Sequence, residues 1–415
     1  MKFQTIIIGG GLSGLTAGIK LAEAGQKVAI VSSGQSTFHF FSGSLDLLNS
    51  DGTNAVQRPL DSLETLSPSH PYKKIGAEAM TALTESAVAF LRNCGLRFEG
   101  GGNVNRYRIT PFGTIKPSWI SLDDCLTMET PDKFPYKTLG IVNISGYLDF
   151  YPQFLSLGLE KIGVDCRTMA VSAPQLQAMR KSSTEMRAPN MARVMTSETI
   201  ECIATSLNVA DMAIEAFILP AIFGINDTLA LDELRSKVKR PVSFIPTMPT
   251  SVPGVRSQII LRSYFQKLGG IYLLGDSVTG GDFADNNLRY VTTVNLGQDR
   301  LEADNFILAT GSFLSHGLKS TPEKVYESVF GLDVDSYQQR EDWFKADFYE
   351  SQPYMGFGVI SDADFRLSRE EKTISNLYGV GSVLGGCDAI ALGCGGGVAL
   401  FTALHVANKI LNSSK

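Results

Sequence analysis

The sequence predicts an α/β fold in which a Rossmann-like domain is interrupted by an inserted α+β domain. Three observations lead to this prediction. The chain opens with an apolar strand, a glycine-rich turn and a helix, glycines cluster again near the far end, and residues 100–249 have no such motif. Because both ends carry the same kind of turn, we expect residues 1–99 and 250–415 to form one discontinuous domain. Residues 100–249 would then be inserted into it.

Composition limits the classes of protein to which the chain can belong. The 415 residues include 37 Lys and Arg against 42 Asp and Glu, a net charge of −5, so we expect no nucleic-acid partner. A hydrophobic content of 44% is enough for a packed core and excludes a disordered chain. No apolar run reaches the about 20 residues of a membrane-spanning helix, and no signal-peptide cleavage site is present. We therefore expect the isolated chain to be soluble in the cytoplasm.

The first thirty residues predict a strand, a turn, a helix and a second strand. Phe3–Ile8 is rich in β-branched residues, Leu12–Ala24 has apolar residues at helical spacing, and Val28–Val31 is a second apolar run. The turn has G-x-G-x-x-G spacing, at Gly9, Gly11 and Gly14. In this motif the first glycine makes the turn, the second admits a phosphate, and the third lets the helix pack closely. The unit predicts a flavin-binding domain of the FAD/NAD(P)-binding, glutathione-reductase-like type; an incidental glycine-rich turn is the alternative.

The end of the second strand departs from this pattern. An acidic residue usually stands there and binds the adenosine ribose, but this chain has Ser32 and Ser33. A serine binds a hydroxyl more weakly than a carboxylate does. The sequence therefore supports a phosphate at the helix N-terminus better than it supports a full adenine dinucleotide.

Later segments complete the predicted site. Gly34–Ser36 and Ser42–Ser44 resemble flavoprotein loops that contact the phosphate and lie along the flavin ring, although ordinary Ser/Gly loops are the alternative. Ile271–Leu274 is a predicted strand with Val278 just beyond it, and Ala303–Gly311 is a strand ending in Ala-Thr-Gly. A glycine-rich run then precedes the predicted helix Val398–Leu411, whose N–H groups suit the electron-rich edge of a flavin.

Together these segments predict one cofactor site at which both ends of the chain meet. The residues expected to contact the cofactor are Gly9, Gly10, Gly11, Leu12, Ser13, Gly14, Ser32, Ser33, Gln35, Ser36, Ser42, Gly43, Ser44, Val278, Ala309, Thr310, Gly311, Gly381, Ser382, Gly396, Gly397 and Val398.

The middle of the chain predicts a mixture of strands and helices without fixing their topology. Thr138–Ile144 and Val164–Val171 are strand-like, whereas Phe150–Ile162 and Glu198–Ile214 are helical in pattern. Pro241–Pro253 is interpreted as a proline-rich connector back to the flavin-binding domain.

Four stretches resemble the B-subunit family of anaerobic glycerol-3-phosphate dehydrogenase, and the resemblance covers nearly the whole chain. They are Gly9–Gly14, Gly34–Ser36 with His39–Leu48, Pro249–Arg256, and Gly385–Asp388 through Gly393–Gly397. The stretch from Ser42 to Leu48 is the most specific to this family.

The resemblance implies a flavin subunit that oxidises sn-glycerol 3-phosphate to dihydroxyacetone phosphate and passes electrons to quinone, with fumarate or nitrate as final acceptor. It implies FMN as cofactor, which agrees with Ser32 because FMN has no adenosine ribose; FAD is the alternative. It also implies two partners, a catalytic flavin subunit and an iron–sulfur subunit that anchors the complex to the membrane. The chain would then lie at the cytoplasmic face of the inner membrane, held there through its partners.

Candidates for catalysis and metal binding are few. The six cysteines lack the close spacing of iron–sulfur or structural zinc sites, so we expect no metal and interpret them as small apolar residues. His39 is the only histidine in the flavin-facing segment and is a candidate base, although a structural role is commoner. Arg256 and Arg289 are possible anion binders or, more commonly, solvated surface charges. No catalytic residue is assigned.

Two other functions remain open. The chain could be a flavin-containing electron-transfer and scaffold subunit that never meets substrate, which the scarcity of acid–base groups favours. It could also be an independent oxidoreductase of the fumarate-reductase-like group that acts on a small dicarboxylate. That function would call for several Arg and His in residues 100–249, which contain no His.

Overall fold

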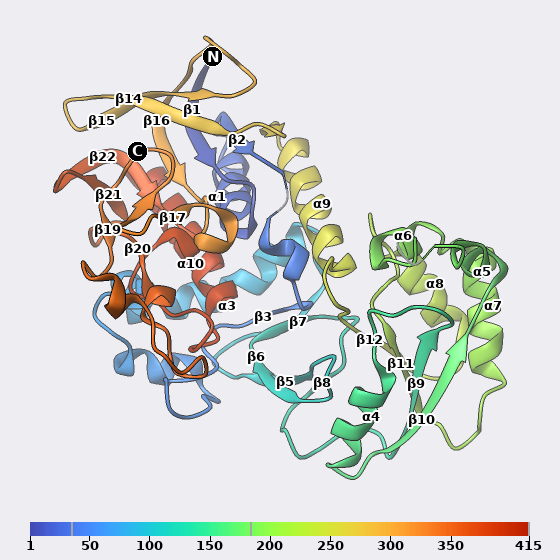
Figure 1. Cartoon of the computed structure of the whole chain (residues 1–415). Coiled ribbons are helices and arrows are strands. Elements are labelled where there is room, and N and C mark those ends of the chain that lie inside the picture. The colour runs from blue at the N-terminus through green and yellow to red at the C-terminus, as the bar shows by residue number, and fades with distance from the viewer. Residues whose placement is uncertain (35, 183–184, 414–415) are drawn as a thin grey trace.

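Strand β1 (Lys2–Ile8) lies in the middle of the main sheet of the computed structural model, which describes residues 1–34, 36–182 and 185–413. The strand order is β13-β2-β1-β16-β15-β14, with β22 and then β21 joined to β16 (Figure 1). Strands β13, β2, β1, β16 and β22 are parallel, and the other three are antiparallel to their neighbours. The remaining bounds are β2 (Val28–Ser32), β13 (Ile271–Leu274), β14 (Val278–Ala284), β15 (Asn287–Thr293), β16 (Leu301–Leu308), β21 (Arg366–Arg369) and β22 (Lys372–Gly379).

Helix α1 (Leu12–Glu23) contacts both α9 (Val252–Lys267) and α10 (Gly395–Ser413), and α10 also contacts α2 (Pro71–Ile75) and α3 (Ala77–Asn93). Strand β1, helix α1 and strand β2 confirm the unit predicted from the first thirty residues. The segments joined in this way are far apart in the sequence, since α1 and α10 stand at opposite ends of the chain. The two ends therefore build one hydrophobic cluster around the main sheet.

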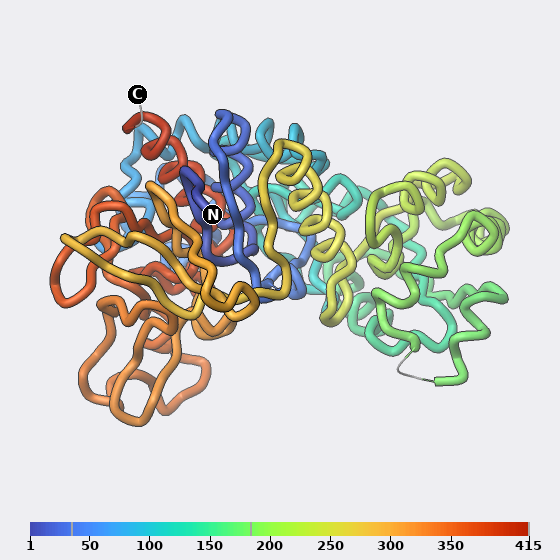
Figure 2. Tube along the Cα trace, turned by 90° about the horizontal axis from the view of Figure 1, so that it is seen from above, coloured from blue at the N-terminus to red at the C-terminus, as the bar shows by residue number. Residues whose placement is uncertain are grey.

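A second sheet lies within the middle of the chain, in the order β10-β9-β11-β12, and its strands are all parallel. It forms a separate lobe at the right of both views (Figure 1, Figure 2) and has its own hydrophobic cluster. Its elements are β9 (Thr138–Ile144), α4 (Pro152–Glu160), β10 (Asp165–Val171), α5 (Pro174–Met179), α6 (Ala188–Arg193), α7 (Ser197–Asn208), β11 (Ala216–Pro220), α8 (Leu229–Lys237) and β12 (Val242–Ile245).

Small sheets join the two clusters or lie at the surface. Trp119, between β6 and β7, is fully buried in the first cluster, whereas Ile109 of β5 belongs to the second. The chain enters and leaves the second lobe at neighbouring points, because the N–H of Phe244 donates to the carbonyl of Asp124 at 2.8 Å. The short strands are β3 (Ser44–Leu45), β4 (Phe98–Gly100), β5 (Arg106–Ile109), β6 (Ile115–Ser118), β7 (Ile120–Leu122), β8 (Thr127–Met128), β17 (Leu318–Ser320), β18 (Val325–Glu327), β19 (Val334–Asp335) and β20 (Gly358–Val359).

Two boundaries predicted from the sequence are wrong. The segment Pro241–Pro253 is no connector, because it holds strand β12 and the first turn of α9. The Ser251 hydroxyl caps α9 by accepting the N–H of Gly254 at 3.1 Å, and a proline is tolerated in a first helical turn. Helix α7 ends at Asn208 and not at Ile214. Beyond it, the Asp211 carboxylate accepts the N–H of Ala213 and the chain forms a turn.

No helix in the part of the chain that the structure describes is both long enough and apolar enough to span a membrane.

Candidate flavin-binding site

The turn between β1 and α1 requires glycine at two positions for steric reasons. Gly9 has φ +118°, and a Cβ there would lie 2.6 Å from the carbonyl carbon of Ala309 at the end of β16. A Cβ on Gly14 would overlap the carbonyl oxygen of Gly9. The turn is therefore tight, and α1 begins directly against it, as the spacing predicts.

Gly11 differs, because its missing side chain leaves open space. Among the residues that the structure describes, a Cβ on Gly11 would have one neighbour within 4 Å, the Cβ of Ser36 at 3.7 Å. Gly11 is also the N-cap of α1, no side chain caps the helix there, and its first turn holds no acidic residue. The positive end of the helix dipole thus faces a position that a phosphate can occupy.

Turns at the ends of β16 and β22 meet the first turn of α1. A Cβ on Gly381 would lie 2.6 Å from Oγ of Ser13, and one on Gly311 would lie 3.5 Å from Oγ of Ser382. The Thr310 hydroxyl between them is shielded from solvent and has no hydrogen-bond partner among the described residues. In a parallel sheet, ligands bind beyond the carboxyl ends of the strands. An unpartnered hydroxyl at this edge fits a site for a polar ligand.

Helix α10 begins beside the segment that the sequence predicts to lie along the flavin ring. The N–H of Gly397 donates to the carbonyl of Asp46 at 2.9 Å, and a Cβ on Gly396 would lie 3.1 Å from Cα of Leu45. Gly43 has φ +80° and approaches Cys125 closely. Ser44 is buried, and its hydroxyl lies 2.8 Å from that of Ser121. A ligand would therefore meet Ser44 through its backbone.

The end of β2 carries hydroxyl groups where a ribose-binding carboxylate is usual. Ser32 is buried, and a Cβ on Gly10 would lie 2.5 Å from its Oγ. The hydroxyl of Tyr272 in β13 donates to the carbonyl of Gly10 at 3.3 Å. Ser33 is exposed, Val278 is the first residue of β14, and Gln35 lies outside the described residues.

Asp46 is a candidate acid–base group that our sequence analysis did not identify. Burial raises the pKa of its carboxyl group, while the charges of Arg108 and Lys116 act in the opposite direction. Its Oδ1 is shielded from solvent and has no hydrogen-bond partner in the described part of the chain. Asp46 lies inside the stretch most specific to the family, which was the one available signal, but its burial depends on tertiary packing.

Cationic groups accompany this carboxyl group. Arg108 lies half-buried on β5, and its Nε has no hydrogen-bond partner among the residues described here. Lys116 lies exposed on the neighbouring strand β6. A guanidinium with an unpartnered Nε, beside a half-buried carboxyl group, can bind an anion such as a phosphate while the carboxylate accepts a proton.

The structure also places two of the other candidates, His39 and Arg289. His39 lies in a short 3-10 helix (Thr37–Phe40), its Nδ1 is 3.3 Å from Oγ1 of Thr250, and burial lowers its pKa. A lowered pKa favours the neutral imidazole that a base requires. Arg289 is exposed and 3.6 Å from Asp282, in agreement with a solvated surface charge.

Arg256 is neither an anion binder nor a surface charge, so both interpretations from the sequence are wrong. It is 3% exposed, and its guanidinium lies 2.5 Å from a carboxylate oxygen of Asp124. It also donates to the carbonyls of Phe223 and Gly224, each at 3.0 Å. The guanidinium N–H groups of Arg256 therefore donate to the side of the second lobe that α9 faces.

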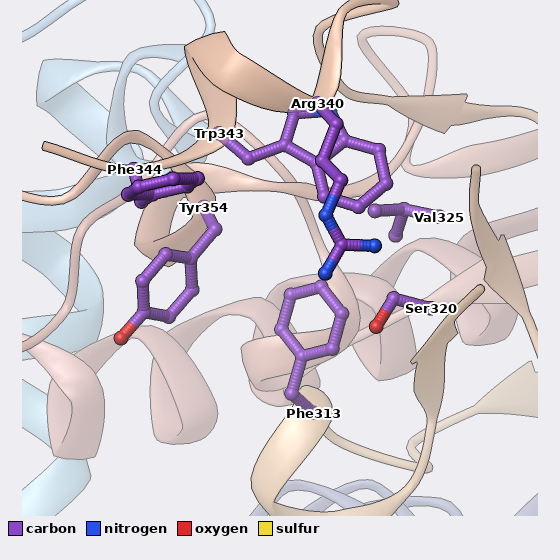
Figure 3. Close-up of a pocket in the computed structure, with 7 residues that line it drawn as sticks. All are labelled: Phe313, Ser320, Val325, Arg340, Trp343, Phe344 and Tyr354. Carbon is purple, nitrogen blue, oxygen red and sulfur yellow. The ribbon is translucent and has the colours of Figure 1, made fainter. Parts of the chain in front are cut away.

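A hollow of about 350 Å³ lies near the end of β16 but contains none of the predicted flavin contacts (Figure 3). Figure 3 shows the side chain of Arg340 among the aromatic rings that line the hollow, and its guanidinium carbon lies 5.7 Å from the centroid of the Trp343 ring. The lining residues are Phe313, Ser320, Val325, Arg340, Trp343, Phe344 and Tyr354.

Two cysteines near α10 lie in contact with each other, which our interpretation of the cysteines as small apolar residues did not predict. The Sγ atoms of Cys387 and Cys394 lie 3.3 Å apart, and Nε2 of His70 lies 3.9 Å from Cys394. These three side chains offer ligand atoms within 4.8 Å of one another. Spacing in the sequence could not show that a turn and a distant histidine bring them together.

The fold and the turns at its strand ends define a flavin-dependent oxidoreductase, and a family model described as an FAD binding domain matches residues 4–398. The B subunit of anaerobic glycerol-3-phosphate dehydrogenase from Yersinia pestis is 40% identical over 99% of each chain. Its counterpart from Pectobacterium carotovorum is 39% identical over 99% of each chain. The chain therefore belongs to the B-subunit family of anaerobic glycerol-3-phosphate dehydrogenase.

Among solved structures, the 3-ketosteroid Δ1-dehydrogenase of Sterolibacterium denitrificans is 11% identical, covering 99% of this chain and 100% of that one, with a TM-score of 0.43. A likeness at that level adds nothing to the family assignment.

Proposed function

We propose that this chain is the flavin subunit of an anaerobic sn-glycerol-3-phosphate dehydrogenase complex. In this complex, glycerol 3-phosphate is oxidised to dihydroxyacetone phosphate and the electrons pass to quinone, with fumarate or nitrate as final acceptor. The observation that carries the proposal is the meeting of three glycine turns beside the uncapped N-terminus of α1. Membership of the B-subunit family supplies the substrate and the complex.

The flavin in this proposal is FMN, and FAD is the alternative favoured by the family model. The phosphate would lie at Gly11, and the flavin ring would lie along Ser42–Ser44 and the start of α10. Ser32 and Tyr272 support FMN, because a buried and a half-buried hydroxyl group stand where FAD needs a ribose-binding carboxylate. Chromatography of the cofactor released by heat decides between them. Stoichiometric FAD would overturn FMN without affecting the proposed site.

The substrate would bind beside Asp46. When bound, the flavin supplies a two-electron acceptor for the hydride of the secondary alcohol. Asp46 would accept the hydroxyl proton, and Arg108 with Lys116 would hold the phosphate. His39 is the second candidate for the base, since burial lowers its pKa and keeps the ring neutral.

The proposed complex contains two further subunits, a catalytic flavin subunit and an iron–sulfur subunit that attaches the assembly to the cytoplasmic face of the inner membrane. Electrons on the flavin of this chain must reach a quinone in the membrane, so the lone chain should show almost no quinone-linked turnover. Co-expression with both partners should restore turnover and move the chain to the membrane fraction. Robust oxidation of glycerol 3-phosphate by the lone chain with a quinone analogue would refute this division of labour.

The catalytic role is tested in the co-expressed complex. Asp46→Asn should lower kcat by about 10²- to 10⁴-fold, as expected for loss of a general base, while flavin occupancy stays unchanged. Asp299→Asn, at an exposed position, is the matched control. If Asp46→Asn and His39→Gln both leave kcat unchanged, this chain is an electron-transfer and scaffold subunit that does not meet substrate.

The division of the chain is also a proposal: residues 1–99 and 250–415 form the flavin-binding domain, and residues 100–249 are inserted to cover the flavin and meet substrate or a partner. Two separate hydrophobic clusters support it. The packing of Trp119 in the first cluster indicates that part of the linking segment belongs with the flavin-binding side.

A further inference from the structure

A turn just before α10 brings two cysteines together. Cys387 and Cys394 stand at its two ends, and the Asp388 carboxylate shapes it by accepting the N–H groups of Ile390 and Ala391. The N–H of Cys394 closes the turn by donating to the carbonyl of Ala389 at 3.2 Å. The two Sγ atoms lie 3.3 Å apart, and a disulfide needs a separation of about 2.0 Å. A small movement of the side chains would therefore close the bond.

His70 is oriented toward this pair. Its Nδ1 accepts the N–H of Tyr72 at 3.1 Å, where His70 caps α2. In the neutral imidazole the proton then resides on Nε2, which lies 3.9 Å from Sγ of Cys394. His70 thus presents an N–H group to the sulfur atoms, and a hydrogen-bond donor stabilises a thiolate.

The two thiols are unequal. The thiol of Cys394 donates to Cys387 and, with His70, lowers the pKa of Cys387, although burial and Asp388 oppose this effect. The pKa of Cys394 is raised, because a thiolate at Cys387, burial, Asp388 and Asp46 all disfavour a second negative charge. Cys387 is partly exposed, whereas Cys394 is buried. The pair therefore combines an accessible thiolate with a protected thiol.

Two other cysteines show the contrast. Burial raises the pKa of Cys94 to about 12 and that of Cys166 to about 11, so their thiols are unreactive at neutral pH. Cys387 and Cys394 differ from these in that their sulfur atoms are in contact with each other, not in their exposure.

We propose that Cys387 and Cys394 form a redox-active dithiol that reduces small-molecule disulfides. The thiolate of Cys387 attacks one sulfur of the disulfide, whose S–S bond breaks and releases one thiolate. Cys394 then gives up its proton to solvent and attacks Sγ of Cys387 in the mixed disulfide. The Cys387–Cys394 bond forms and the second thiolate leaves. From the thiolate of Cys387 and the thiol of Cys394, the protein loses two electrons and one proton, and the small disulfide becomes two thiolates that take up protons from solvent.

The test uses the full chain, with flavin and after flavin removal, equilibrated in glutathione redox buffers of increasing oxidised fraction. After alkylation, mass spectrometry should find one disulfide that joins Cys387 and Cys394 in both forms of the protein. Cys394→Ser should accumulate glutathione on Cys387, whereas Cys387→Ser should accumulate none on Cys394. Cys202→Ser, which alters a cysteine of α7 in the other lobe, should behave as the unaltered chain.

Two outcomes would overturn the proposal. One is the absence of a Cys387–Cys394 disulfide at every buffer ratio. The other is one zinc ion per purified chain with both thiols resistant to alkylation until a chelator removes the metal, since three ligands with an open position can hold zinc. Because the disulfide is also measured in flavin-free protein, failure of this proposal can be distinguished from failure of the proposed flavin function.

Discussion

Gly11 and Gly14 belong to one motif, but glycine is required at them for different reasons. Gly14 is packed against the backbone of Gly9, so any side chain there disturbs the fold. Among the described residues, a Cβ on Gly11 would make only an ordinary contact with Ser36, so a side chain there should meet the proposed ligand without disturbing the fold. Substitution at Gly11 therefore separates cofactor binding from folding.

We predict that Gly11→Val leaves the protein folded but weakens flavin binding by at least about 100-fold, or about 2.7 kcal/mol. The valine side chain would occupy the position proposed for the phosphate. Fluorescence titration with FMN and FAD measures the affinity, and circular dichroism checks the fold. Gly280→Val is the matched control: a Cβ at this position in β14 meets no described residue within 4 Å, so the variant should fold and bind flavin normally. Full flavin occupancy in Gly11→Val would show that the turn does not hold the phosphate.

A second prediction concerns Asp46 and pH. Its folded pKa is raised, so its favourable contribution to stability is fully present below the unfolded pKa of about 3.9 and is lost as pH rises through the folded pKa. Asn has the same shape without the charge, so Asp46→Asn should increase the free energy of unfolding at pH 7. The difference should shrink toward pH 3. Urea unfolding at both pH values measures it, with Asp299→Asn as control. A destabilised variant at pH 7 would contradict the assignment of Asp46 as a penalised buried charge.

At the scale of elements, the sequence was most informative where local chemistry decides the structure. The strand, turn and helix from Phe3 to Ala24 could be predicted, because hydrophobic spacing and glycine positions act over a few residues. The sequence does not predict the start of α9, because Pro253 suggests a break, whereas Ser251 caps a helix there. The contact of His70 with Cys394 could not be predicted, because it depends on α2 packing against α10.

The third prediction concerns helix α9, which Arg256 links to the second lobe. Arg256→Leu should lower the free energy of unfolding by about 3–5 kcal/mol, because it leaves the carboxylate of Asp124 buried without its partner. Adding Asp124→Asn should recover part of this loss. Arg289→Leu removes an exposed arginine and should change stability by no more than about 0.5 kcal/mol. Equal effects of Arg256→Leu and Arg289→Leu in urea unfolding would rule out a stabilising role for the buried pair.

The whole molecule should unfold in two steps, because its two large hydrophobic clusters are separate. Both tryptophans, Trp119 and Trp343, lie outside the cluster of the second lobe. Tryptophan fluorescence should therefore follow the flavin-binding side alone, while far-ultraviolet circular dichroism follows both lobes.

Bound flavin supplies the control for this prediction. Saturating flavin should shift the fluorescence transition to higher urea and leave the other step in place, because a ligand stabilises only the unit that binds it. Coincident transitions by both probes, shifted together by flavin, would show that the chain unfolds as one unit.

The hydrogen bond between Phe244 and Asp124 has a consequence for the history of the gene. This hydrogen bond places the two points at which the chain enters and leaves the second lobe next to each other, as the termini of independent domains often are. A coding segment for residues 126–243 can thus be gained, lost or exchanged at one position without rethreading the strands of the main sheet. Evolution can change the second lobe in a single recombination event and keep the framework of the main sheet intact.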